Sequence, residues 1–271
     1  MEHKHIAFIG AGNMAGAIMG GLVASGYPAK AITAANRSEG KLETLADELG
    51  INTTTDNLKA AEAADVVVLG VKPNMMEGVV KQLAHLNDGK KLFISIAAGV
   101  TLAHFEAWFG KAVPMIRTMP NTPSLVGLGM TGLYASDTTN KDDKAISDML
   151  MRAVGKTAWV KNEIELDHII AAAGSAPAYF FLFMEAMEAK AIELGFDAAT
   201  ARELVQQTAS GAAEMVRRRD MPIRELRRQV TSPGGTTAKA IESFQAAGLE
   251  KIVAGAMDAA ISRAAEMAKE L

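Results

Sequence analysis

The sequence predicts an α/β protein with a doubly wound, mostly parallel sheet at its N-terminus and an all-α domain at its C-terminus. Three observations support this fold class. Short apolar runs alternate with helical patterns up to about residue 160, a glycine-rich turn follows the first run, and only helical periodicity remains beyond residue 162. Strands separated by helices are typical of βαβ units, which build a parallel sheet covered by helices on both faces.

The strands are predicted from runs of apolar residues. The earlier runs are Ile6–Ile9, Ile32–Ala35, Val66–Leu69, Leu92–Ile96 and Val113–Ile116. Later strands at 129–134 and 157–161 are expected to complete the sheet. Continuous apolar runs of this kind indicate strands that are buried on both faces.

Helices are predicted between the strands. Residues 13–25 carry apolar side chains at a four-residue spacing, which places them on one face of a helix. A helix over residues 39–49 is closed by Gly50, the residue type favoured just after a helix end. Asp56 is expected to cap the next helix, because a carboxylate accepts hydrogen bonds from the first free N–H groups.

The chain of 271 residues is long enough for about two domains. We expect the boundary near residue 162, between a sheet domain (1–162) and an all-helical domain (163–271). A predicted helix over 177–194 is apolar nearly all round and must be buried on most of its surface. A half-chain of about 110 residues has little room for that burial, so we expect a second subunit to cover the helix.

The composition excludes several classes of protein. Lys and Arg number 28 and Asp and Glu 31, a net charge of −3 without the basic excess of a nucleic-acid-binding protein. The absence of cysteine excludes disulfides, cysteine metal sites and a thiol nucleophile. No signal or transit pattern is visible, and the most apolar run, Ala176–Met184, has about half the length that spans a bilayer. We expect a cytoplasmic protein with no metal and no nucleic-acid or membrane partner.

A glycine-rich turn, Gly10-Ala11-Gly12-Asn13-Met14, links the first strand to the first helix. Gly10 permits the tight turn, Gly12 lets the backbone approach a pyrophosphate, and the helix N-terminus supplies free N–H groups. The third glycine of the motif is replaced by Ala15, which is also small. This context predicts a Rossmann-type dinucleotide site. The alternative is a glycine turn that binds no ligand.

The second strand is followed by Asn36-Arg37-Ser38. Enzymes that use NAD usually carry an acidic residue here for the ribose 2′-hydroxyl, whereas an arginine accommodates a 2′-phosphate. No acid occurs before Glu39, so NADP is favoured over NAD. The alternative is a solvated turn, in which Asn and Ser are common.

Loops after other strands are expected to border the same crevice. They are Val71-Lys72-Pro73, Ala97-Ala98-Gly99 and Thr118-Met119-Pro120-Asn121-Thr122-Pro123. Small residues at 97–99 would let a flat nicotinamide ring lie close to the backbone. Taken alone, these loops also fit plain strand-to-helix turns.

Two segments of the helical half depart from a regular helical pattern. Gly174-Ser175-Ala176-Pro177 interrupts the apolar periodicity. In Val230–Thr237, Pro233 ends one helix and a glycine pair precedes the next. Free N–H groups at 235–237 form a candidate carboxylate site, and a simple Ser/Thr helix cap is the equal alternative.

With these motifs the sequence resembles the pyrroline-5-carboxylate reductase family over nearly the whole chain. The matching segments are Phe8–Met14, Val71–Pro73, Ser95–Val100, Met119–Pro123, Gly174–Tyr179 and, most specifically, Val230–Phe244. The resemblance implies hydride transfer from NAD(P)H to the C5 carbon of a cyclic imine. The product would be L-proline, formed in the last step of proline biosynthesis.

The resemblance also implies roles for individual residues. The pyrophosphate of the cofactor would bind at Gly10, Ala11, Gly12, Asn13 and Met14, and the 2′-phosphate at Asn36, Arg37 and Ser38. The adenosine ribose would lie near Asn57. The nicotinamide half would lie along Val71, Lys72, Pro73 and Ala97. The substrate would be bound by Ser175, Ser232 and the N–H groups of Gly235, Thr236 and Thr237, with the Thr237 hydroxyl on the ring nitrogen as the catalytic group. Family members form dimers through the helical half, often assembled into rings of dimers.

Two other functions remain open at this point. The same scaffold could reduce another small imine or keto acid, because a fold does not fix a substrate. The other alternative is a protein that is not an enzyme: it would sense a dinucleotide and be catalytically silent. Its sequence would have no need of an intact Ser232–Thr237 loop.

Overall fold

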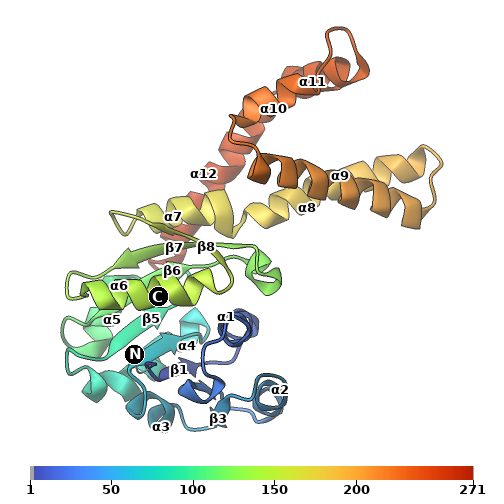
Figure 1. Cartoon of the computed structure of the whole chain (residues 1–271). Coiled ribbons are helices and arrows are strands. Elements are labelled where there is room, and N and C mark those ends of the chain that lie inside the picture. The colour runs from blue at the N-terminus through green and yellow to red at the C-terminus, as the bar shows by residue number, and fades with distance from the viewer. Residues whose placement is uncertain (1–2, 271) are drawn as a thin grey trace. The chain divides into compact units, whose positions relative to one another are not determined.

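The computed structural model describes residues 3–270 and separates into two compact units (Figure 1). The first comprises residues 3–175 together with 260–270, and the second comprises Ala176–Ala259. The boundary expected near residue 162 lies inside the first unit, just after its last strand. The division into functional domains at that residue stays a prediction.

The first unit contains an eight-stranded sheet with the order β3-β2-β1-β4-β5-β6-β7-β8. The strands are β1 (Ile6–Ile9), β2 (Ile32–Ala35), β3 (Asn52–Thr54), β4 (Val66–Leu69), β5 (Leu92–Ser95), β6 (Met115–Met119), β7 (Gly129–Ala135) and β8 (Gly155–Trp159). All neighbouring strands are parallel except β6 and β7, which are antiparallel. The predicted doubly wound, mostly parallel sheet is confirmed. Because the strand order reverses beside β1, the carboxyl ends of β1 and β4 border the crevice where such sheets bind ligands.

Helices cover both faces of this sheet. One face is covered by α1 (Asn13–Ala24), α2 (Gly40–Leu49) and α6 (Lys141–Arg152), and the other by α3 (Asn57–Glu62), α4 (Pro73–Leu83) and α5 (Leu102–Phe109). Short 3₁₀ helices lie at η1 (Ala29–Ala31), η2 (Ala84–Leu86) and η3 (Thr122–Val126).

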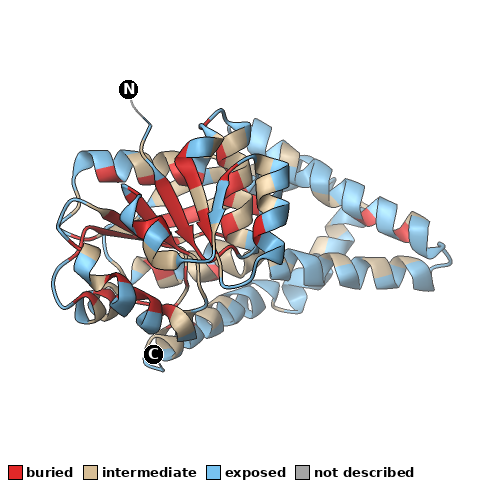
Figure 2. Cartoon of the chain, turned by 90° about the horizontal axis from the view of Figure 1, so that it is seen from below, coloured by how far each residue is buried: buried red, intermediate tan, exposed pale blue. Residues whose placement is uncertain are grey.

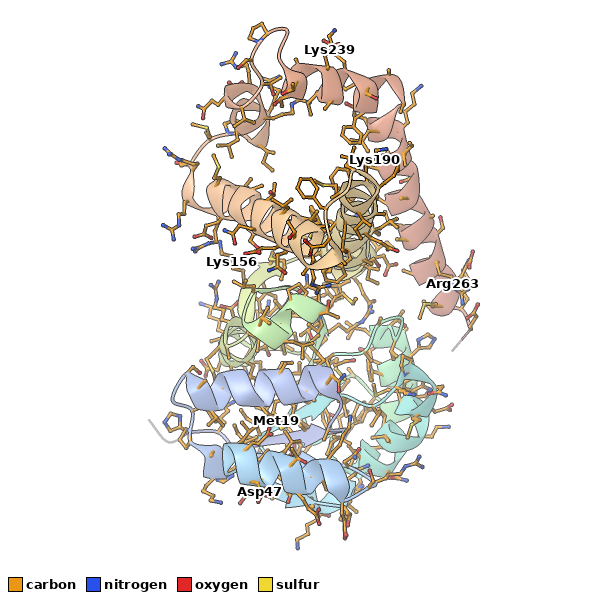
Figure 3. All side chains as sticks on the ribbon, turned by 90° about the vertical axis from the view of Figure 1, so that its right-hand side faces the viewer. Met19, Asp47, Lys156, Lys190, Lys239 and Arg263 are labelled. Carbon is orange, nitrogen blue, oxygen red and sulfur yellow. The ribbon has the colours of Figure 1, made fainter. Side chains whose placement is uncertain are left out.

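The core consists of two apolar layers, one on each side of the sheet. In β1, Ile6 and Phe8 belong to one layer, while Ala7 and Ile9 belong to the other. Figure 2 shows this burial concentrated in the strands, and Met19 of α1, labelled in Figure 3, is fully buried in the first layer. Strands with both faces covered have no polar alternation, which explains the continuous apolar runs.

Two predicted helix ends are confirmed. Gly50 follows α2 with a φ of 67°, in the left-handed region that favours glycine. Asp56 caps α3 by accepting hydrogen bonds from the N–H groups of Leu58 (2.9 Å) and Lys59 (3.1 Å). β3 was not predicted, because its three residues are polar and partly exposed at the edge of the sheet.

The segment after the sheet is more regular than the sequence suggests. α7 (Glu165–Ile169) continues into a π-helix, η4 (Ile170–Gly174), and α8 (Ala176–Glu193) follows after a single residue. The expected interruption around residues 174–177 is therefore corrected to a π-helical turn. The start of α7 is held by Glu163, whose Oε1 accepts from the Arg117 guanidinium and from the Leu102 N–H, both at 2.6 Å.

The carboxyl of Asp167, on α7, makes the stability of the protein depend on pH. Burial raises the pKa of its carboxyl, and the positive charge of Arg117 only partly offsets that rise. A carboxyl whose pKa rises on folding destabilises the native state when ionised, and stability returns as the pH falls through the raised pKa. We expect Asp167→Asn to raise the melting temperature at neutral pH and to lose this gain in acid. Thermal unfolding at several pH values checks this, with the exposed Asp137→Asn as control; a gain unaffected by pH would contradict it.

The second unit contains helices only. They are α8, α9 (Ala198–Arg218), α10 (Ile223–Gln229), α11 (Thr236–Ala246) and the first part of α12 (Leu249–Met267), whose last residues belong to the first unit. Many large apolar side chains of this unit are exposed, among them Phe180, Phe181 and Leu182 on α8. Within residues 3–270, the helical segment Glu165–Glu193 is long and apolar enough, by length and composition, to cross a membrane. This helical segment is longer than the apolar run Ala176–Met184 identified in the sequence.

Candidate active site

A cavity of about 520 Å³ lies at the carboxyl ends of β1, β2 and β4. Its lining residues come from the turns after these strands and from the helices that follow. They are Gly10, Ala11, Gly12, Asn36, Arg37, Ser38, Lys41, Asn57, Gly70, Val71, Lys72, Met75 and Val79. The structure therefore brings together most of the residues predicted to bind the cofactor.

The first glycine turn leaves no room for a side chain at Gly10. Its φ is +99°, and a Cβ there would lie 2.8 Å from the backbone C of Gly70 and the N of Val71. The turn is held by two backbone hydrogen bonds of 2.8 Å, from the Gly10 N–H to Ala35 and from the Gly70 N–H to Ile9. Gly10 is thus required by the packing of two strand ends.

Gly12 has a different reason to be glycine. A Cβ at Gly12 would meet no atom within 4 Å, so the fold itself does not exclude a side chain. Gly12 is exposed in the cavity and is the N-cap of α1, without a side-chain capping bond. Open space beside a helix N-terminus fits close approach of an anionic pyrophosphate.

Three cations line the cavity, two of them beside the turn after β2 and the third just before α4. Asn36 orders the turn, because its Nδ2 donates to the Ser38 hydroxyl (3.1 Å) and carbonyl (3.3 Å). Arg37, Lys41 and Lys72 line the cavity, and within residues 3–270 none of them forms an ion pair. An uncompensated group of cations beside a dinucleotide crevice fits a phosphate group.

Four of the predicted cofactor residues do not line this cavity. Asn13 and Met14 form the first turn of α1, Pro73 is the first residue of α4, and the buried Ala97 follows β5. Their assignment stays a prediction.

The cavity also includes residues that the sequence reasoning missed. They are Lys41, Gly70, Met75 and Val79. A signal for Lys41 exists: it lies in the first turn of α2, where the helix dipole disfavours a cation. A lysine in that position is better explained by an anion than by the helix.

The predicted substrate loop belongs to the second unit. Gly234 has a φ of +70°, and Gly235 is the N-cap of α11, without a side-chain capping bond. Thr236 and Thr237 are exposed at the start of the helix, on which Figure 3 labels Lys239. Within the described chain no acceptor is recorded for their N–H groups. The alternative of a side-chain cap at this helix is not realised.

One predicted donor of this loop is engaged elsewhere. The Gly235 N–H donates to the Ser232 carbonyl at 3.0 Å, so it is not free to bind a carboxylate in this structure. The N–H groups of Thr236 and Thr237 are the available donors. Ser232, also predicted to bind the substrate, is exposed in this loop. Ser175, predicted with it, ends the first unit directly after the π-helix, and both assignments stay predictions.

Comparison with known proteins identifies the family. The family model described as "Pyrroline-5-carboxylate reductase dimerisation" matches residues 163–267, and "NADP oxidoreductase coenzyme F420-dependent" matches residues 5–99. The pyrroline-5-carboxylate reductase of Vibrio alginolyticus is 54% identical over 270 residues, covering 99% of each chain. The chain belongs to the pyrroline-5-carboxylate reductase family. The pyrroline-5-carboxylate reductase of Pseudomonas aeruginosa is 45% identical, and the match covers 100% of this chain and 99% of the relative.

Solved structures of pyrroline-5-carboxylate reductases agree with this assignment. The enzyme of Coxiella burnetii has a TM-score of 0.94 at 44% identity and covers 98% of this chain and 99% of its own. The Plasmodium falciparum protein, solved with NADP bound, has a TM-score of 0.87 at 28% identity, over 99% of both chains. The expected family, fold class and enzyme class, an NAD(P)-dependent oxidoreductase, are confirmed. The roles of the individual site residues stay predictions.

Proposed function

We propose that this protein reduces L-1-pyrroline-5-carboxylate to L-proline with NADPH, the last step of proline biosynthesis. The observation that carries the proposal is the glycine turn at Gly10 and Gly12, which shares one cavity with three cations that form no ion pair among residues 3–270. The near full-length identity to relatives named for this reaction supports the substrate. The test is NADPH oxidation that depends on added pyrroline-5-carboxylate.

The chain's own groups mainly bind and orient the reactants. When bound, NADPH supplies the hydride that adds to C5 of the protonated imine, whose C=N π electrons pass to the ring nitrogen. The N–H groups of Thr236 and Thr237 bind the substrate carboxylate at the start of α11. We assign the Thr237 hydroxyl to a hydrogen bond with the ring nitrogen and Ser175 to a contact with the substrate through a water molecule.

Such a site needs little acid–base chemistry. A protonated imine is already an electrophile, so holding it in line with the hydride donor is the main task. Orientation of this kind contributes about 7–11 kcal/mol in well-oriented systems. The cofactor carries the redox chemistry, which leaves positioning to residues such as Thr237.

We expect the two cations beside the turn after β2, Arg37 and Lys41, to favour NADPH over NADH. Arg37, Ser38 and Asn36 bind the 2′-phosphate, and Lys41 adds a second positive charge from α2. NADH lacks that phosphate and gains nothing from these groups. NADH is accepted more weakly.

Arg37→Asp is expected to weaken NADPH binding about 10- to 100-fold and NADH binding much less. The reason is the loss of a charge-assisted hydrogen bond worth about 1.5–3 kcal/mol. Fluorescence titration with both cofactors measures the two affinities, and Lys41→Ala should show the same selectivity to a smaller extent. Lys144→Ala, an exposed lysine of α6 outside the cavity, is the control. Equal losses for both cofactors would remove the 2′-phosphate site.

The exposed apolar side chains of α8 support a homodimer formed through the helical domain. In the most apolar stretch of the Glu165–Glu193 segment only 11% of residues are buried. Glu185, Glu188, Lys190 and Glu193 interrupt its C-terminal part, which fits a protein partner better than lipid. A second copy covers this surface in a cytoplasmic protein, and rings of such dimers are the larger assembly. Light scattering in detergent-free buffer tests this, since a monomer would contradict it.

A further inference from the structure

Beyond the π-helix η4, a proline leaves one backbone carbonyl without its usual helical donor. In η4 the Ser175 N–H donates to the Ile170 carbonyl at 2.7 Å, one residue farther back than in an α-helix. The regular partner of the Ala173 carbonyl would be the N–H of residue 177, and Pro177 has none. Ala173 is half-buried, and a carbonyl left unpaired there destabilises a structure unless another donor reaches it.

That donor is Asn121, in the turn after β6. Its Nδ2 donates to the Ala173 carbonyl at 3.0 Å, and its Oδ1 accepts from the Met130 N–H of β7 at 2.9 Å. The side chain is buried, with 8% of the residue exposed. The carboxamide of Asn121 supplies a donor on one side and an acceptor on the other, and both are used. Asn121 therefore ties the π-helix to the sheet.

The packing around this hydrogen bond is equally close. A Cβ on Gly174 would lie 2.9 Å from the Met119 Cε, and a Cβ on Gly132 of β7 would lie 2.9 Å from Ile169. Two glycines thus let the helical segment rest directly on β6 and β7. Because η4 is fixed at this distance, the next residue, Ser175, has a fixed position as well.

We propose that Asn121 is a positioning residue for substrate binding, which holds the π-helical turn and through it Ser175. This inference rests on the proposed function, in which Ser175 contacts the substrate. Asn121 touches neither substrate nor cofactor in this role. Loss of its donor releases the Ala173 carbonyl and lets η4 relax toward another helical form, so that Ser175 moves.

Asn121→Asp is the sharpest variant, because it keeps the acceptor for Met130 and replaces the donor to Ala173 with a carboxylate oxygen. We expect KM for pyrroline-5-carboxylate to rise about tenfold to a hundredfold, as for a lost buried hydrogen bond. The Kd for NADPH should stay within about twofold of the wild-type value. Asn121→Ser, which removes the amide without adding a charge, should act in the same direction if the aspartate impairs folding.

Asn87 offers a matched control. It is also buried, and its Nδ2 donates to the Ala112 carbonyl at 3.1 Å, away from the candidate site. Asn87→Asp should lower the melting temperature and leave KM unchanged. This separates a general effect of losing a buried amide from an effect on the substrate.

A double-mutant cycle with Ser175→Ala tests whether Asn121 acts through Ser175. We expect Asn121→Asp to raise KM strongly in the wild-type background and by less than about twofold in the Ser175→Ala background. Additive effects, or a variant that changes only the melting temperature as Asn87→Asp does, would overturn the proposal.

Hydrogen exchange provides a readout that does not depend on turnover. The Ser175 amide should exchange at least about tenfold faster in Asn121→Asp than in the wild type, because its bond to Ile170 loses support. Unchanged exchange overturns the proposal even if the enzyme is active. Wild-type protein that shows no turnover, together with faster exchange in the variant, would instead refute the proposed function and retain the structural link.

Discussion

Gly12→Ala is expected to weaken NADPH binding at least about tenfold in a protein that still folds. A Cβ at this position meets no protein atom within 4 Å, so the native packing accepts it. Alanine at a helix N-cap costs at most about 1 kcal/mol. In the proposed site, the same Cβ would occupy the space through which the pyrophosphate approaches the N-terminus of α1. Fluorescence titration with NADPH and urea unfolding measure the two effects separately.

Gly10→Ala and Gly26→Ala complete this experiment. At Gly10 the Cβ would lie 2.8 Å from backbone atoms, so that variant should lose both stability and cofactor binding. Gly26 has a similarly positive φ, +91°, but open space around it, so Gly26→Ala reports strain alone and should bind NADPH normally. Wild-type NADPH affinity in Gly12→Ala would show that the pyrophosphate does not lie on this turn.

Thr237→Ala is expected to lower kcat about a hundredfold with NADPH binding unchanged. In the proposed site its hydroxyl orders the ring nitrogen of the imine, and removing one preorganised hydrogen-bonding group aimed at the charge that changes in the transition state typically costs about 10²–10³ in rate. Single-turnover measurements of NADPH oxidation isolate this step. Thr237→Ser keeps the hydroxyl and should recover much of the rate.

Thr236→Ala is the matched control for this experiment. Thr236 is the neighbour of Thr237 in the first turn of α11, and only its backbone N–H is used in the proposed site. Its kcat should stay within about twofold of the wild-type value. If the two alanine variants lost activity equally, the hydroxyl of Thr237 would have no special role and the loop would act through its backbone alone.

Many of the residues that line the cavity were predictable from the sequence, because the backbone conformation restricts which residue types fit there. Gly10 follows a strand and needs a positive φ, and no other residue type fits between two strand ends. The Asn36-Arg37-Ser38 turn was recognisable by the absence of an acid. Lys41 was missed, although a lysine in the first turn of the predicted helix over 39–49 is unfavourable to the helix dipole; its place in the cavity became visible only in the structure.

The parts that were not predicted depend on distant contacts or on weak local patterns. β3 has no apolar run, since a short edge strand needs none. The π-helix was read as an interruption at Gly174 and Pro177. Its regularity depends on Asn121, which is 52 residues away from Ala173 in the sequence, and no local pattern encodes that hydrogen bond.

The helical half shows a different limit. Its periodicity predicted helices correctly, and its excess of apolar side chains predicted an uncovered surface. Phe180 (69% exposed) and Leu182 (68% exposed) remain uncovered in a single chain. These side chains need a partner surface for their burial, and the family model named for dimerisation supports a second copy of the chain as that partner.

The reduction of pyrroline-5-carboxylate is tested most directly by mixing the full-length protein with NADPH and pyrroline-5-carboxylate and following the NADPH absorbance. The assay is then repeated with NADH. We predict oxidation that requires the imine, formation of L-proline in equal amount, and a lower KM for NADPH than for NADH. No oxidation with either cofactor, in protein shown by titration to bind NADPH, would contradict the claim and favour another imine, a keto acid or a silent sensor.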